Sequence, residues 1–460
     1  MDMVNQIREK YNTEIEKLLT EYAEKLFEIA TSSTMSEIEE HVTHNIGALT
    51  REIVQQVISK NNEELRASKA IRKEQGLVLE RRDDPREILT RFGAIRYKRD
   101  YYQKRDGRYV YPIDKQLDVA SYERLTPDVV KTLLEKSKTY SYEKASIEAT
   151  DGMVSKQTVM NAIRNTTIDT KHDEKPKKVE VLHVDADEAH VTIKNGAKRM
   201  IPLICSYEGV DTSNKRHKCI NLKRYSQYGL RGDEIWEKFI KDLSKDYDLS
   251  STRVYIHGDG AKWIRTGLEW FNDARFVLDQ YHKNKYIKVF GTNMAKADAT
   301  KFEGEIQKTL NSGEIENLAA IHGEAIDKYP ECQETITTAI NYLYNNYDGV
   351  KIRLTDEESN NGGCTEPHVS HILASRLSTR PMAWSKETLE KFVKILTSDN
   401  LQIIPNSMTA VNEVVNKKKK NKIRYRFTAG LANPDESISL DFLQKSSGTT
   451  GMLKHILCEC

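Results

Sequence analysis

The sequence predicts a multidomain α/β protein. The chain has 460 residues, a length that suggests about two to four domains. Apolar residues recur every three or four positions in the first 75 residues, which indicates helices, whereas short apolar strands dominate the middle of the chain. Between residues 178 and 278 the predicted order is strand, strand, strand, helix, strand, helix, strand. This order is typical of a mixed sheet covered by helices.

The composition argues against several classes of protein. Lysine and arginine (71 residues) nearly balance aspartate and glutamate (69), which gives a net charge of +2. No apolar run approaches the roughly 18–20 residues of a transmembrane helix, and the charged N-terminal segment lacks the apolar stretch of a signal peptide. The 6 cysteines are sparse. Cys458 and Cys460 are the only close pair, and this short, isolated pair does not predict a zinc site. We expect a reduced, cytoplasmic protein without membrane contact.

Residues 1–75 are predicted to form two amphipathic helices. Apolar side chains recur at helical spacing from Val4 to Leu26 and again from Ile38 to Val57. Two such helices cannot bury their apolar stripes alone. The segment is therefore either an arm for oligomerisation or a helical pair packed on the rest of the chain.

A basic, tyrosine-rich segment follows. Residues 81–115 hold 11 lysine or arginine residues against 6 acidic ones, and alternation around Asp106 and Gly107 predicts a β-hairpin. Such a hairpin can contact phosphates and stack on bases, or it can be an ordinary solvated strand face. The candidate DNA contacts in this segment are Arg96, Lys98 and Arg99.

Residues 125–165 show the pattern of a helix-turn-helix. A predicted helix, a short turn containing Gly152 and a second helix follow one another, and Ser155 is a good N-cap for the second helix. Helical hairpins without a DNA partner also produce this pattern. In DNA-binding proteins, base-reading side chains lie at the start of the second helix, and the residues at that position are Lys156, Gln157 and Thr158.

The middle of the chain supplies the predicted sheet. We expect strands at 178–185, 199–207, 219–225, 254–257 and 275–278, and helices at 233–243 and 262–270. Helical patterns then continue to residue 360, and a further helix is expected to begin near Glu366. The tail is basic, and its run of lysines supplies further candidate DNA contacts. These lysines are Lys417, Lys418, Lys419 and Lys420.

Three acidic residues stand out on this frame. Asp187 is expected at the end of the first strand, Asp259 just past the fourth strand and Glu366 at the start of the late helix. In an RNase H-like fold the first and fourth strands are neighbours and a late helix crosses them, so the three carboxylates meet. Clustered carboxylates repel one another unless divalent cations neutralise them. Two Mg²⁺ ions, which Mn²⁺ can replace, would support in-line displacement at a phosphodiester.

Each acid alone also has an ordinary structural explanation. Asp259 can cap a turn or a helix, and Glu366 can interact favourably with a helix dipole. Asp185 lies two residues before Asp187, shares its face of a regular strand and stays an alternative first acid. The site prediction therefore depends on the three acids together.

The sequence around the acids forms three motifs. They read HVDADEAHV at 183–191, HGDGAKW at 257–263 and CTEPHVSH at 364–371. These motifs resemble the acid motifs of DDE transposases of bacterial insertion sequences. The resemblance is closest to the Mutator-like branch, and in particular to a group long catalogued as an uncharacterised protein family. Further stretches fit that group: RFG at 91–93, YSYEKA at 140–145, LDQYHKNK at 278–285 and RLSTRPMAWS at 376–385.

The resemblance implies the roles of the acids. Asp187 matches the first catalytic acid, since the family pattern expects an aspartate followed by a short turn and Val191, and Asp185 is the alternative. Asp259 matches the second acid and Glu366 the third. The helical stretch between the last two matches the all-α insertion of Mutator-like enzymes.

The resemblance also points to residues that handle DNA. Related branches carry Cys-x-x-His after the fifth strand, where this chain has Asp279-Gln-Tyr-His282. His282 is therefore retained, either for DNA positioning or for structure, and the cysteine is not. Arg376, Arg380 and Trp384 are candidates for phosphate contact and base stacking, and the alternative for all three is helix-end packing.

The expected organisation and function follow. The function implied is a DNA transposase that acts on double-stranded DNA as a homo-oligomer, with Mg²⁺ and no small-molecule cofactor. The alternatives are an RNase H-like nuclease without strand transfer and a catalytically silent helix-turn-helix DNA-binding protein. The expected regions are a helical arm (1–75), a hairpin and helix-turn-helix region (76–172), an RNase H-like core (173–285), an all-α insertion (286–360), the last core helix (361–400) and a basic tail (401–460).

Overall fold

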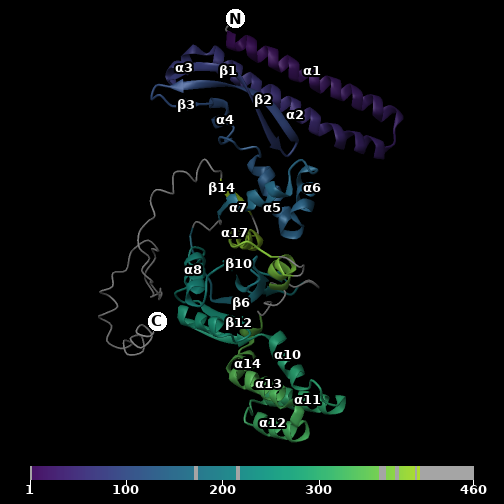
Figure 1. Cartoon of the computed structure of the whole chain (residues 1–460), viewed down its shortest axis with the longest axis vertical. Coiled ribbons are helices and arrows are strands. Elements are labelled where there is room, and N and C mark those ends of the chain that lie inside the picture. Colours follow the sequence, from purple (N-terminus) through teal and green to yellow (C-terminus); the bar gives the residue numbers. More distant parts are fainter. Residues whose placement is uncertain are drawn as a thin grey trace, which may run out of the picture.

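The chain forms an elongated molecule built around a central mixed sheet (Figure 1). The computed structural model describes residues 3–169, 175–213, 218–361, 369–378, 383–398 and 401–404. Helices and a mixed sheet are distributed over several structural units, which confirms the predicted multidomain α/β class. No helix in these described ranges is both long enough and apolar enough to span a membrane.

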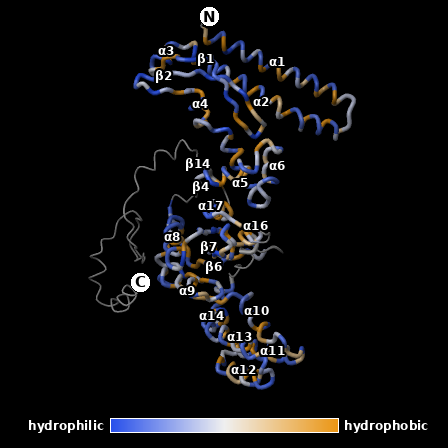
Figure 2. Tube along the Cα trace, viewed as in Figure 1, coloured by the Kyte–Doolittle hydropathy of each residue, from blue (hydrophilic) through white to orange (hydrophobic). Residues whose placement is uncertain are grey.

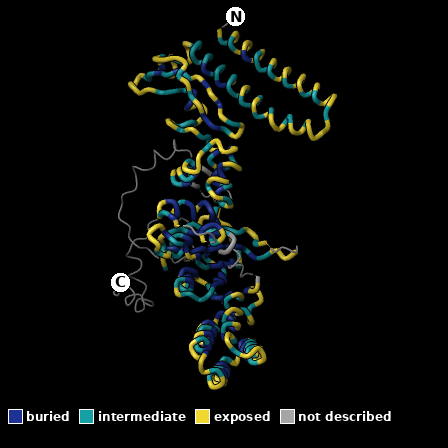
Figure 3. The backbone as a smooth tube through the Cα atoms, turned by 45° about the vertical axis from the view of Figure 1, so that its right-hand side comes forward, coloured by how far each residue is buried: buried dark blue, intermediate teal, exposed yellow. Residues whose placement is uncertain are grey.

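The N-terminal segment is a helical hairpin of α1 (Met3–Ser32) and α2 (Met35–Ala67), followed by the short α3 (Lys69–Glu74). The two predicted helices are confirmed. Thr34 and Glu37 form a capping box that starts α2. The only buried side chain of α1 is Tyr11, and exposed residues predominate along this helix, whereas most residues of α2 are partly buried (Figure 3). Short hydrophobic stretches alternate with hydrophilic ones along them (Figure 2).

A three-stranded antiparallel sheet packs against α2. Its strands are β1 (Leu77–Thr90), β2 (Gly93–Lys104) and β3 (Tyr109–Val110), followed by α4 (Pro112–Gln116). The predicted hairpin around Asp106 and Gly107 joins β2 to β3. The longer hairpin, which joins β1 to β2, was not predicted. Pro85 and the irregular pairing between Arg81 and Asp84 interrupt the alternation of β1.

Three helices link this sheet to the centre of the molecule: α5 (Pro127–Thr139), α6 (Tyr142–Thr150) and α7 (Lys156–Asn165). The predicted turn lies between α6 and α7, where Asp151 and Gly152 both have positive φ. Ser155 accepts a hydrogen bond from the backbone N–H of Thr158 at 3.1 Å, so the predicted N-cap is confirmed. The short strand β4 (Thr167–Asp169) follows and pairs with β14 (Gln402–Ile404).

The central sheet has the strand order β10-β7-β6-β12-β13. Strand β7 is antiparallel to both of its neighbours, β6 and β10, whereas β12 is parallel to both β6 and β13. All five predicted strands are present, and the first and fourth are neighbours. The bounds are β6 Val181–Thr192, β7 Lys198–Tyr207, β10 Lys223–Ser226, β12 Arg253–Gly258 and β13 Asp273–Leu278.

Short strands and the two predicted helices complete this region. The strands are β5 (Lys177–Lys178), β8 (Val210–Asp211), β9 (Lys218–Cys219) and β11 (Tyr247–Asp248); the helices are α8 (Asp233–Leu243), α9 (Lys262–Arg265) and the 3-10 helix η1 (Thr266–Trp270). The predicted third strand is shorter than expected, because residues 218–219 pair with β8 instead of the central sheet.

The two faces of the sheet are covered differently. Even-numbered residues of β6, such as Leu182 and Val184, pack with Trp236 and Ile240 of α8. Odd-numbered residues near the end of β6, such as Val191, pack with α5, α7 and α17 (Lys386–Thr397). The odd-numbered face becomes polar nearer to the start of β6.

A helical insertion follows β13 and lies at the opposite end of the molecule from the hairpin (Figure 1). Its core is continuous with the α8 side of the sheet. The predicted helices here are confirmed. The elements are α10 (Gln280–Phe290), α11 (Lys296–Ser312), α12 (Asn317–Lys328), the 3-10 helix η2 (Pro330–Cys332), α13 (Gln333–Asn345), α14 (Tyr347–Thr355) and the 3-10 helix η3 (Glu357–Asn361).

Candidate active site

The first predicted acid lies within a strand and not at its end. We predicted that the strand stops near Asp185 and that a short turn follows Asp187; both expectations were wrong. Strand β6 continues to Thr192, because β7 pairs with it along its whole second half. By contrast, β12 pairs with β6 only as far as Asp185. Asp187 therefore lies in the stretch of β6 that has lost its parallel neighbour.

Asp187 and Asp259 occupy corresponding places on the two parallel strands. The last registered pair is Asp185 with His257, and each aspartate lies two residues beyond a member of that pair. The strands stay close there, since a Cβ on Gly258 would lie only 2.8 Å from the carbonyl oxygen of Ala186. Both aspartates are half-buried.

The structure separates the two candidates for the first acid. Asp185 is 1% exposed, and it accepts a hydrogen bond from Tyr207 Oη at 2.8 Å. Asp187 is more accessible, and its Oδ1 accepts from the backbone N–H of Glu188 at 2.7 Å. A metal ligand needs an accessible oxygen, so this arrangement favours Asp187.

The electrostatics link the two aspartates. Burial raises the pKa of Asp187 to about 6, and the negative charges of Asp259 and Glu188 add to this effect. The hydrogen bond from the Glu188 amide and the charge of His282 act in the opposite direction. The two carboxylates therefore share one electrostatic environment, in which a positive charge is favourable.

His282 lies at the start of α10 beside an aspartate that replaces the expected cysteine. Asp279 is the N-cap of α10, and its Oδ1 accepts from the N–H of Tyr281 at 2.8 Å. Its Oδ2 lies 3.5 Å from His282 Nδ1. Burial lowers the pKa of His282, but the adjacent carboxylate of Asp279, with the charges of Asp187 and Asp259, raises it overall. Asp279 therefore favours the protonated imidazole near both acids.

The third predicted acid, Glu366, lies outside the described residues. The π-helix η4 (Val369–Ala374) begins three residues later and continues into α16 (Ser375–Leu377). Leu373 and Leu377 pack against the odd-numbered face of β6, with Ala189 and Val191. A late helix therefore crosses the strand that carries Asp187. Among the residues that the structure describes, no three His, Cys, Asp or Glu side chains form a group that could hold a metal ion.

The structure places Arg376 and Trp384 in the core. Trp384 is 6% exposed, stacks on Phe392 and donates from Nε1 to the carbonyl of Leu377 at 3.1 Å. Arg376 is 8% exposed, donates to the carbonyl of Ser137 at 2.8 Å, and its guanidinium lies over the ring of Tyr142. This burial favours the alternative of helix-end packing. Arg380 and Lys417, Lys418, Lys419 and Lys420 lie outside the described residues.

The hairpin candidates differ from one another. Arg99 forms an ion pair with Asp114 and covers the ring of Tyr111 at 3.7 Å, so it has a structural role. Arg96 is well exposed but forms an ion pair with Glu87. Lys98 is exposed and lines a surface groove beside Arg96. Part of the positive charge of this segment is therefore neutralised within the sheet.

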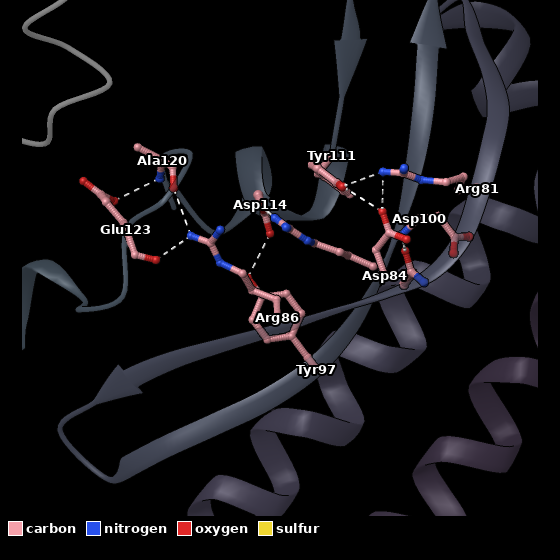
Figure 4. A network of polar contacts seen from close by, with 11 residues as sticks. Arg81, Asp84, Arg86, Tyr97, Asp100, Tyr111, Asp114, Ala120 and Glu123 are labelled. Carbon is pink, nitrogen blue, oxygen red and sulfur yellow. Dashed lines mark hydrogen bonds and ion pairs between the residues drawn. The ribbon is translucent and has the colours of Figure 1, made fainter. Parts of the chain in front are cut away.

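The same segment contains a wider network of polar contacts (Figure 4). Tyr97 Oη donates to Asp114 at 2.9 Å, and Tyr111 Oη donates to Asp84 at 2.7 Å. Arg86 donates to the carbonyl of Ala120 at 3.0 Å. Several charged groups of the segment thus hold β1, β2 and the loop after α4 together.

The start of α7 presents its predicted residues to solvent. Lys156 and Gln157 are exposed, and Thr158 is half-buried and takes part in the Ser155 cap. At the other end of α7, Arg164 donates to Thr388 Oγ1 at 2.7 Å and thereby fixes the helix to α17. The helix that carries these exposed residues is therefore anchored to α17 at its other end.

Sequence reasoning missed one further contact beside the acids. Trp263 Nε1 donates to Glu188 Oε2 at 2.6 Å. This bond joins the helix after Asp259 to the residue after Asp187. Both residues are within the quoted motifs, but nothing in their spacing indicates that they touch.

The fold and the site define a multidomain mixed α/β protein with two aspartates at corresponding places on adjacent parallel strands. The chain belongs to the Uncharacterised protein family (UPF0236), whose family model matches residues 30–403. This membership confirms the part of the predicted resemblance that concerns a family catalogued as uncharacterised.

The relatives match most of the chain. One UPF0236 protein of Caldanaerobacter subterraneus subsp. tengcongensis is 36% identical over 380 residues, which cover 81% of this chain and 78% of the relative. Another from the same organism is 35% identical over 382 residues, or 81% and 79% of the two chains. A UPF0236 protein of Streptococcus gallolyticus, named for the vanSb 3′ region, is 23% identical over 387 residues, or 80% and 84%.

Proposed function

We propose that this protein is a DNA transposase of the DDE type with an RNase H-like core. The observation that carries the proposal is the placement of Asp187 and Asp259 two residues beyond the last paired residues of adjacent parallel strands. The strand order β10-β7-β6-β12-β13, with a late helix over β6, is the arrangement expected of an RNase H-like core. Glu366 completes the proposed triad.

The names of the relatives support this proposal. One relative has a name that combines eleven locus designations of a single genome, and two others have names that combine four and two. A protein encoded at many places in one genome is expected of a mobile element that spreads copies of itself.

The donor set at the site fits Mg²⁺. Carboxylate oxygens are the ligands that this ion prefers, and burial with the neighbouring charge of Asp259 already disfavours the ionised form of Asp187. Asp187, Asp259 and Glu366 would hold the metal ions. When bound, Mg²⁺ neutralises phosphate charge and activates a water or a 3′-hydroxyl for in-line attack.

The chain's own residues position the DNA and the acids. His282 lies beside Asp279, which favours its protonated form, and it would offer this imidazole near both aspartates, where a scissile phosphate would lie. The loop after β12 fixes Asp259, whose Oδ1 accepts from the N–H of Ala261 at 2.8 Å. Hydrolysis frees a 3′-hydroxyl at the element end, and this hydroxyl then attacks the target strand. No covalent protein intermediate forms, so catalysis consists of positioning and charge stabilisation.

Binding of the element ends is assigned to α7 and to the exposed face of β2. Lys156 and Gln157 are exposed at the start of α7, and Lys98 lies on the exposed face of the hairpin. Two ends must be brought together, so we expect an oligomer. The outer side of α1 suits this contact, because Leu19 and Phe27 are 47% and 74% exposed.

The metal affinity is expected to depend on pH. Protons compete with the cation at Asp187, whose pKa is raised to about 6. The affinity for Mg²⁺ should therefore be constant above neutral pH and fall roughly tenfold per pH unit below about pH 6. Calorimetric titration with Mg²⁺ measures this change. Asp187→Asn should bind weakly and without this dependence; equal wild-type affinity at about pH 5 and about pH 8 would contradict the prediction.

Two substitutions in α7 separate positioning from sequence recognition. Gln157→Ala should weaken binding to the element's own ends by about 1–3 kcal/mol and leave binding to unrelated DNA unchanged. Lys156→Ala should weaken both and reduce the slope of log affinity against log salt by about one. Fluorescence anisotropy measures both. Lys308→Ala, at an exposed position of α11, is the control. Wild-type binding by both α7 variants would remove α7 from the interface.

A strand-transfer assay tests the function itself. The wild-type protein is incubated with labelled fragments that carry the inverted repeats flanking its gene, with a target plasmid and Mg²⁺. Joined products support the transposase. Cut but unjoined products would indicate a nuclease, and binding without cleavage would indicate a DNA-binding protein that has lost catalysis.

A further inference from the structure

We propose that the helical insertion holds the loop of the second aspartate in place, with Tyr342 as the positioning residue for Asp259. The inference rests on the proposed function, in which Asp259 is a catalytic carboxylate. Tyr342 belongs to α13 and is 83 residues away from Asp259 along the chain. The fold therefore brings a distant helix to the loop that follows β12.

Tyr342 contacts the backbone of the acid itself. Its Oη donates a hydrogen bond to the carbonyl oxygen of Asp259 at 2.7 Å. The ring of Tyr342 stacks on Tyr286 of α10 at 3.6 Å between ring centroids, which fixes the direction of the hydroxyl.

Asn346 packs closely against Gly260, the next residue of the loop. Gly260 has φ of +85°, and a Cβ at this position would lie 2.0 Å from Asn346 Oδ1. Asn346 is 6% exposed, and its Nδ2 donates to the carbonyl of Tyr342 at 3.0 Å. Tyr342 and Asn346 are thus linked to each other and to consecutive residues of the loop.

A third contact holds the far side of the loop. Arg265 of α9 donates to Asn346 Oδ1 at 2.9 Å and binds both carboxylate oxygens of Asp348 at 2.8 Å each. The insertion therefore forms hydrogen bonds with both ends of the segment from Asp259 to Arg265. The Asp259 carboxylate accepts from Ala261 within this segment, so its direction follows that of the loop.

Tyr342→Phe tests this role, because it keeps the stacked ring and removes only the donor. We expect faster amide hydrogen exchange at residues 259–261, cleavage slowed about tenfold at saturating DNA, and unchanged DNA affinity. Tyr344→Phe is the matched control, since Tyr344 lies on the same helix and is 58% exposed. The control should match the wild type in all three measurements.

The outcomes distinguish this inference from the proposed function. Unchanged exchange in Tyr342→Phe would overturn the inference, and so would wild-type cleavage despite faster exchange. If the wild-type protein neither cuts nor joins DNA, the proposed function fails. The exchange comparison then decides by itself whether Tyr342 holds the loop.

Discussion

Asp187→Asn is expected to abolish catalysis and at the same time to stabilise the metal-free protein. In the folded chain burial and the charge of Asp259 raise the pKa of Asp187 from 3.8 to about 6. The ionised carboxylate therefore opposes folding at neutral pH, by on the order of 1–3 kcal/mol, and an uncharged amide of the same shape removes this cost. Catalysis should fall at least about a hundredfold, since a ligand and a charge are lost.

The sign of the pH dependence follows from the same shift. The protonated carboxyl stabilises the fold fully below pH 3.8, and this contribution is lost as pH rises through about 6. Thermal unfolding in a chelator at neutral pH should therefore give a higher Tm for Asp187→Asn than for the wild type. Asp327→Asn, at an exposed position of α12, should change neither Tm nor activity. A lower Tm for Asp187→Asn would show that its carboxylate is not destabilising.

Arg66→Met is expected to cost about 3–5 kcal/mol of folding stability in the N-terminal unit. Asp100 is fully buried, and Arg66 donates to its two oxygens at 2.6 and 2.7 Å. Arg66 also donates to Asp83 at 2.8 Å, so one guanidinium ties α2 to both long strands. Methionine keeps much of the apolar stem but leaves the Asp100 carboxylate without its cation.

Urea unfolding followed by circular dichroism measures this loss. Arg8→Met is the matched control, because Arg8 forms an exposed ion pair with Glu64 and its loss should cost at most about 1 kcal/mol. Burial raises the pKa of Asp100, but the hydrogen bonds from Arg66 and the Asp83 amide lower it overall. The wild-type stability contributed by this pair should therefore be lost as pH falls below the usual aspartate range. Equal effects of the two arginine variants would contradict the account of the buried pair.

Much of the fold could be predicted, because its patterns are local. The apolar residues of α1 and α2 recur at helical spacing, and Ser155 is a recognisable N-cap at the start of α7. The full extent of β6 could not be predicted in this way. Its second half, from Asp187 onwards, is a strand because β7 pairs with it. This half is rich in polar residues, so its own sequence does not indicate a strand.

The candidate site was predicted in part, for a similar reason. The position of Asp259 follows from the end of β12, whereas Asp187 lies within β6 and not at the predicted end of that strand. The burial of Arg376 and Trp384 depends on α5 and α17, which are far apart in the sequence and meet only in the fold. The hydrogen bond from Tyr342 to Asp259 likewise joins residues that are 83 positions apart, so no local motif could predict it.

The central claim is that Asp187 and Asp259 belong to one site that joins DNA strands. The most direct measurement compares the wild type with Asp259→Asn in a Mg²⁺-dependent joining reaction that uses pre-cut element ends with a free 3′-hydroxyl. We predict joined product with the wild type, none with Asp259→Asn, and equal binding of the ends by both proteins. Joining by Asp259→Asn at the wild-type rate, or no joining by the wild type while it binds the ends, would contradict the claim.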